Sequence, residues 1–112
     1  MTRRGSRLPR IGVFGGSFDP VHLGHLILAE ATVEHLRLDR LILLPAGRPA
    51  HKRRRVLASP EDRVAMLRLA ARGNPKLEVM TREAVDPGVS FTVRTLEALT
   101  AERRADWFFL MG

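Results

Sequence analysis

The sequence predicts an α/β fold in which helices cover both faces of a parallel sheet. Short apolar runs of strand length alternate with stretches whose apolar residues recur at helical spacing, so the order is β-α-β-α-β-α-β. A helix between each pair of strands is typical of the right-handed crossover that joins parallel strands. The 112 residues are 45% hydrophobic and 28% charged, which suits one soluble domain with a buried core.

The first strand and helix flank a glycine pair. A β-rich run, RIGVFG, predicts a strand over 10–15 that is stopped by Gly15-Gly16. A helix is expected over 23–37, because its apolar residues are spaced for one face. These residues are Leu26, Ala29, Val33 and Leu36.

The second strand and helix are separated by a basic loop. The continuous apolar run RLILLP (40–45) is typical of a strand buried on both faces, and a basic loop follows over 46–58. Ser59 is the expected N-cap of the next helix, with Pro60 in its first position and acidic residues directly after it. Val64, Leu67 and Ala71 form its expected buried stripe, and Gly73-Asn74-Pro75 its end.

The remaining elements complete a Rossmann-like, doubly wound sheet. Strands are expected over 76–80 and 106–111, with a turn at 86–88 and a helix over 92–103 between them. No helix follows the fourth strand, so the sheet is expected to be truncated there. We therefore divide the chain into a basic tail (1–9) and the N-terminal portion of a larger domain (10–112).

Charge and composition limit the function classes. The net charge is +7, which suits phosphorylated ligands, but aromatic residues make up only 5% and are not interleaved with the basic run, so nucleic acid is not favoured. The chain has no cysteine, no secretory signal and no apolar run of membrane-spanning length. We expect a cytoplasmic protein without a membrane partner, and leave a homo-oligomer open.

The junction between the first strand and helix predicts a phosphate site. Helix N-termini offer unsatisfied N–H groups and partial positive charge, and Gly15 and Gly16 would let a ligand approach the backbone. His22 and His25 lie one helical turn apart, where two imidazoles would stabilise phosphate charge. The spacing fits neither the dinucleotide fingerprint nor a Walker loop, and no nearby cysteine or acid completes a metal site with the histidines.

Three motifs carry a family resemblance over most of the chain. GGSFDPVHLGH (15–25) resembles the H-x-G-H nucleotidyltransferase motif in its bacterial pyridine-nucleotide branch. PAGRPAHK (45–52) and SFTVRTLEAL (90–99) are similar to stretches of the nicotinate-mononucleotide adenylyltransferase family. The ending FFLMG (108–112) resembles the strand before that family's Gly-x-Asp motif.

The resemblance implies adenylyl transfer from ATP to nicotinate mononucleotide, which gives deamido-NAD and pyrophosphate, with Mg²⁺ bound with the ATP. His22 and His25 would be the catalytic residues. The implied ATP-binding set adds Gly15, Gly16, Ser17, Phe18 and Gly112 to these histidines. The implied mononucleotide-binding set is Ser17, His51, Lys52, Ser90, Phe91 and Thr92.

Two alternatives remain at this point. The acceptor would be nicotinamide mononucleotide or phosphopantetheine in one, and the chain would be a non-catalytic, basic phosphate- or nucleic-acid-binding domain in the other. The family's late I-S-[ST]-T-x-[IV]-R stretch is not in these 112 residues. We therefore expect the 112-residue chain alone to be weakly active or inactive.

Overall fold

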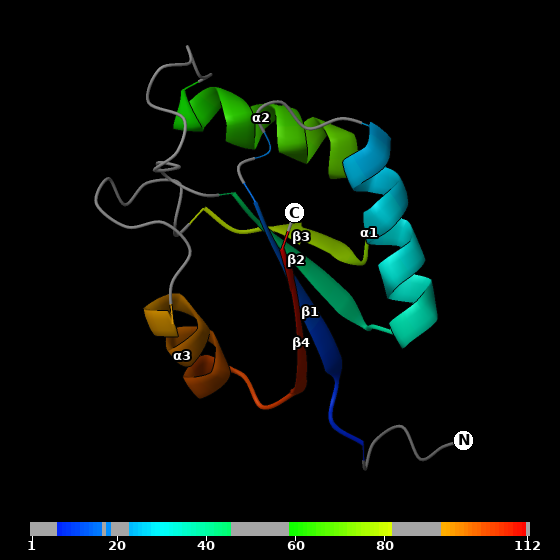
Figure 1. The fold of residues 1–112 in the computed structure, drawn as a ribbon, viewed down its shortest axis with the longest axis vertical. Coiled ribbons are helices and arrows are strands. Elements are labelled where there is room, and N and C mark those ends of the chain that lie inside the picture. Colours follow the sequence, from blue (N-terminus) through cyan, green and yellow to red (C-terminus); the bar gives the residue numbers. More distant parts are fainter. Residues whose placement is uncertain (1–6, 17, 19–22, 46–58, 82–92, 112) are drawn as a thin grey trace.

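The computed structural model describes residues 7–16, 18, 23–45, 59–81 and 93–111. Strands and helices alternate along this part of the chain (Figure 1). Their bounds are β1 Arg10–Gly16, α1 Leu23–Leu36, β2 Arg40–Pro45, α2 Pro60–Ala71, β3 Leu77–Val79, α3 Val93–Glu102 and β4 Asp106–Met111. The predicted order and all seven predicted elements are confirmed, with ends that differ by up to two residues.

The described strands form one parallel sheet in the order β3-β2-β1-β4. The chain adds β2 and β3 on one side of β1 and then returns to add β4 on the other. In open parallel sheets, ligands bind outside the carboxyl ends of the strands where the winding direction reverses. In this sheet that position lies between β1 and β4.

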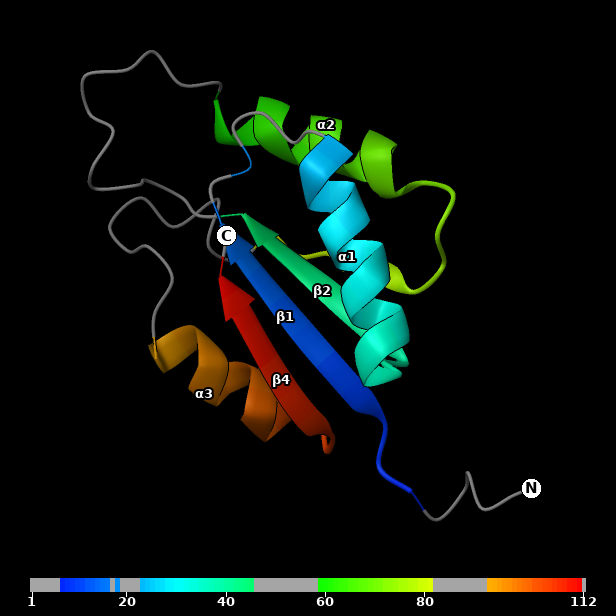
Figure 2. The same cartoon turned by 45° about the vertical axis from the view of Figure 1, so that its right-hand side comes forward.

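Each face of the sheet has its own core. Alternate side chains of β1 and β2, among them Phe14 and Leu43, pack with α1 and α2. The intervening side chains, among them Val13 and Ile42, pack with Leu99 of α3. Figure 2 shows α1 and α2 over one face and α3 over the other, as the predicted doubly wound arrangement requires. β2 is buried from Leu41 to Pro45, which confirms that both of its faces are covered.

Gly12 allows the chain after α1 to pack closely on β1. A Cβ built at Gly12 would lie 2.7 Å from Cδ1 of Leu38 and 2.9 Å from Cδ1 of Leu41. Both leucines are at most 1% exposed. The missing side chain therefore lets the segment that joins α1 to β2 pack directly on β1.

The helix ends show two capping motifs. Ser59 Oγ accepts a hydrogen bond from the backbone N–H of Asp62 at 3.0 Å, which confirms the predicted N-cap of α2. After α1, the N–H of Leu38 donates to the carbonyl of Val33 and the N–H of Arg37 to that of Glu34. This is a Schellman motif, and Arg37 occupies its left-handed position with φ 54°.

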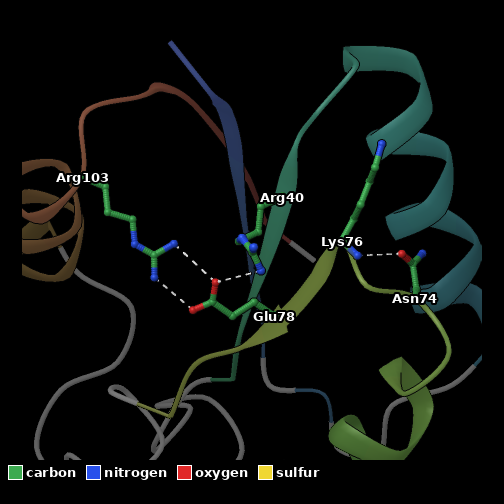
Figure 3. Close-up of polar contacts among 5 residues, drawn as sticks. All are labelled: Arg40, Asn74, Lys76, Glu78 and Arg103. Carbon is green, nitrogen blue, oxygen red and sulfur yellow. Dashed lines mark hydrogen bonds and ion pairs between the residues drawn. The ribbon is translucent and has the colours of Figure 1, made fainter. Parts of the chain in front are cut away.

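An ion-pair cluster joins the edge of the sheet to the end of α3. The Arg103 guanidinium donates two hydrogen bonds to the Glu78 carboxylate, at 3.0 and 3.3 Å, and Arg40 lies 3.7 Å from the same group (Figure 3). The hydrogen bond that Arg103 donates to Glu78 raises the pKa of Arg103, and burial lowers this pKa by a smaller amount. The cluster connects β2, β3 and the segment after α3.

One buried charge was not expected. Arg63 of α2 is 1% exposed, although the sequence pattern alone places charged residues on the outer face of a helix.

In the described part of the chain, no helix has the length and apolar character needed to cross a membrane.

Candidate phosphate site at the carboxyl edge of the sheet

The carboxyl ends of three strands meet at one edge. The last residue of β1, Gly16, is in register with Pro45, the last residue of β2. Gly15 is in register with Met111, the last residue of β4. In Figure 2 the tips of β1 and β4 lie together beside the C mark. Both neighbours of β1 therefore end level with its glycine pair.

Gly15 and Gly16 belong to β1 itself. We expected the strand to stop at this pair, but its pairing with β2 continues through Gly16. No described glycine has a positive φ, whereas Phe18 has φ 51°. The strand thus ends one residue later than expected, because the pairing of Gly16 with Pro45 keeps the second glycine in the sheet.

Phe18, two residues beyond β1, lies in the core. Its side chain is 2% exposed, and its ring packs edge-on against Phe14, with 5.3 Å between ring centroids. A non-glycine residue at positive φ is held only where its surroundings fix it, and burial of an aromatic ring supplies that restraint here. The ring of Phe18 is therefore structural, and only its backbone is available to a ligand.

His25 lies in the first turn of α1, against the same aromatic pair. Its ring centroid is 5.0 Å from that of Phe18 and 6.3 Å from that of Phe14. The side chain is half-buried, so one part packs on the aromatic rings and another part reaches solvent. The two phenylalanines orient an imidazole at the start of a helix. Phe14 was not among the predicted site residues, although the aromatic residues on both sides of the Gly-Gly pair were the available signal.

The first turns of α1 and α2 differ in charge. Its first turn has no Asp or Glu, while the first turn of α2 holds Glu61 and Asp62. Acidic side chains in the first turn offset the positive end of the helix dipole. The N-terminal end of a helix carries partial positive charge, and a helix end without an acid in its first turn can take an anion.

Family membership follows from comparison with known proteins. The family model described as cytidylyltransferase-like matches residues 13–112. This chain belongs to the cytidylyltransferase-like family.

Curated relatives share much of this sequence. The cytidylyltransferase-like chain is 45% identical over 106 residues to a probable nicotinate-nucleotide adenylyltransferase of Thermomicrobium roseum, covering 94% of this chain and 50% of the relative. It is 43% identical over 103 residues to a protein of the same name from Desulfatibacillum aliphaticivorans, covering 92% and 47%. The chain thus spans about half the length of these relatives.

A solved structure shares the fold. Plasmodium falciparum nicotinic acid mononucleotide adenylyltransferase, complexed with NaAD, superposes with a TM-score of 0.65 at 15% identity. The match covers 93% of this chain and 51% of the other. It confirms the Rossmann-like α/β fold class for this cytidylyltransferase-like chain.

The structure brings together part of the predicted site. Gly15, Gly16, Phe18 and His25 lie at the carboxyl edge of β1 and the start of α1. The other predicted site residues lie outside the described residues. These are Ser17, His22, His51, Lys52, Ser90, Phe91, Thr92 and Gly112. Within the described ranges, no three or more His, Cys, Asp or Glu side chains gather where they could hold a metal ion.

Proposed function

We propose that this cytidylyltransferase-like chain carries the ATP site of an enzyme that transfers the adenylyl group of ATP to nicotinate mononucleotide. The observation that carries the proposal is the position of GGSFDPVHLGH. The motif spans the junction of β1 and α1, beside the point where the sheet reverses its winding direction. The names of the curated relatives support the choice of acceptor.

The reaction needs no protein nucleophile. A phosphate oxygen of nicotinate mononucleotide attacks the α-phosphorus of ATP, and the bond from that phosphorus to the leaving pyrophosphate breaks. The products are deamido-NAD and pyrophosphate. The protein's part is to position two anions in line and to stabilise the charge that builds up between them.

The described residues suit the second of these tasks. In the proposed complex, the N-terminal end of α1 and the imidazole of His25 face the phosphates of ATP. The first turn of α1 contains no acidic side chain that would repel them. His22 and the backbone of Gly15, Gly16, Ser17, Phe18 and Gly112 complete the proposed ATP site. Mg²⁺ would enter with the triphosphate, where it offsets phosphate charge; the described residues form no separate acidic cage for it.

The acceptor is proposed to bind at the same edge of the sheet. His51 and Lys52 would follow β2, and Ser90, Phe91 and Thr92 would precede α3. Both segments start at the carboxyl edge of the sheet, the first from β2 beside β1 and the second from β3 on the far side of β2. Cytoplasmic localisation is part of the same proposal, and the oligomeric state stays open.

A histidine pair on one helix tests the proposal. His25→Ala removes the imidazole at the start of α1, and the control His35→Ala removes an exposed imidazole in its last turn. We expect His25→Ala to lower kcat for pyrophosphate release about 10²–10³-fold, as loss of one charge-stabilising donor does. His35→Ala is expected to leave kcat unchanged.

Activity is measured on the polypeptide translated from the complete reading frame, and ATP binding by calorimetry on the 112-residue chain. Nicotinate mononucleotide, nicotinamide mononucleotide and phosphopantetheine are compared as acceptors. If none of them supports pyrophosphate release, the proposed adenylyl-transfer activity is refuted. If another acceptor is preferred, only the choice of nicotinate mononucleotide as acceptor is refuted.

A further inference from the structure

A hollow lies at the edge of the sheet opposite the proposed ATP site. It has a volume of about 760 Å³ and is lined by the segment that leads into β1, by the end of α1 and the turn after it, and by Lys76 before β3. These positions are at the amino ends of the parallel strands. In Figure 1 this edge lies toward the N mark, away from the C mark beside the proposed ATP site.

Basic side chains outnumber acidic ones around this hollow. Arg7, Arg10, Arg37 and Lys76 line it together with Glu34 and Asp39. Asp39 already has partners: its Oδ2 accepts from the N–H of Arg10 at 2.8 Å and lies 3.5 Å from Nη1 of Arg7. The acid that remains to oppose an incoming anion is Glu34.

Arg10 is held in place by protein contacts. Its Nε donates to the carbonyl of Leu36 at 2.9 Å, and its guanidinium lies 4.7 Å from the ring centroid of Phe108. This geometry fixes one cation at the wall of the hollow without a carboxylate on its guanidinium among the described residues. A fixed cation loses little conformational entropy when it binds an anion.

Arg37 and Lys76 supply two further charges. Both side chains are exposed, and neither has an ion pair or a side-chain hydrogen bond with any described residue. In Figure 3 the Lys76 side chain extends away from Asn74 and from the Glu78 cluster. Two cations from separate elements therefore line one hollow without a carboxylate partner in the described part of the chain.

The backbone at Arg37 gives a separate reason to assign this side chain a role. The left-handed position of a Schellman motif favours glycine, and a side chain there is disfavoured. Arg37 nevertheless occupies it and lines the hollow. Backbone strain of this kind is a reason to look for a function of the side chain.

We propose that this hollow binds an oligophosphate anion. Arg10, Arg37 and Lys76 contact the phosphates, and the apolar side chains of Val33 and Leu38 form part of the wall. The site is separate from the proposed ATP site and does not depend on it. The oligophosphate is either inorganic or part of a nucleotide, and the experiment distinguishes these sources.

Residue-resolved titration tests the proposal. Inorganic tripolyphosphate is added to the ¹⁵N-labelled 112-residue chain, and amide shifts are followed by NMR. We expect saturable shifts at Leu38, Asp39 and Lys76 that weaken as salt is added. ATP is titrated in parallel, with the His25→Ala variant used to remove shifts that arise at the other edge. If ATP binds more tightly than tripolyphosphate, the hollow recognises a nucleotide. If the two bind equally, the hollow recognises the oligophosphate alone.

Three substitutions sharpen the test. Arg37→Gly and Lys76→Gln each remove one charge from the hollow, and the control Arg104→Gln removes one from an exposed position outside it. We expect each of the first two to weaken binding about two- to fivefold, and the control to leave it unchanged. Arg37→Gly should also raise the melting temperature, which separates lost binding from lost folding.

Three results would overturn the proposal. One is a set of tripolyphosphate shifts confined to Gly15, Gly16 and His25. Another is wild-type affinity in both Arg37→Gly and Lys76→Gln. The third is tighter binding of a short DNA duplex than of tripolyphosphate at equal phosphate concentration, which would assign the hollow to nucleic acid.

Discussion

Replacing Gly12 with alanine tests how closely α1 is held to the sheet. The new Cβ would lie 2.7 and 2.9 Å from methyl carbons of Leu38 and Leu41, where ordinary contact begins at 3.4 Å. Both methyl groups must retreat by several tenths of an ångström within a buried core. Overpacking of this kind costs about 1–3 kcal/mol. The lower entropy of the unfolded chain returns about 0.4–1 kcal/mol.

The expected net loss is about 0–2.6 kcal/mol in the free energy of unfolding. Urea unfolding would be followed by the fluorescence of Trp107, the single tryptophan, which is half-buried and stacks on Phe109. Gly73→Ala is the matched control, because a Cβ there has nothing within 4 Å and its φ is not positive. We expect it to be stabilised by about 0.4–1 kcal/mol. If Gly12→Ala were as stable as Gly73→Ala, the close packing would be refuted.

Two further predictions concern the helix cap and the ion-pair cluster. Ser59→Ala removes the acceptor for the N–H of Asp62 and should cost about 1 kcal/mol, measured by the urea midpoint; an unchanged midpoint would contradict the cap. Glu78→Gln removes the charge that Arg103 and Arg40 share and should cost about 1 kcal/mol, because the groups are partly exposed. The raised pKa of Arg103 means that its contribution is complete below the pKa of the unfolded chain and is lost only as pH rises through the folded value. The difference between wild type and Glu78→Gln should therefore stay constant from about pH 6 to 9, and a steep change in that range would contradict the assignment.

The sequence was sufficient for the fold because local signals and tertiary packing agree. The apolar run of β2 predicts burial on both faces, and Ser59-Pro60 marks the start of α2 independently of any packing. The end of β1 was predicted one residue too early, because a Gly-Gly pair is a common strand breaker. Gly16 stays in the strand through its pairing with Pro45, which is distant in sequence.

The site was predictable in part. The motif located His25 and the start of α1, but the aromatic support from Phe14 is a contact across the strand–helix junction that spacing does not reveal. The hollow at the amino edge was also missed. Its basic side chains come from three separate segments of the chain. The clearest indication of a role for Arg37, its left-handed backbone conformation, exists only in the folded chain.

The central place of β1 has a consequence for the order of folding. Its pairing with β2 closes a loop of about one βαβ unit, but its pairing with β4 brings Arg10 beside Asp106, near the opposite end of the chain. Loop closure over a longer separation costs more entropy, and contacts distant in sequence slow folding. During synthesis, β1, α1 and β2 can assemble while the other side of β1 still lacks its strand. We therefore expect the pairing of β1 with β4, where the winding reverses, to form last.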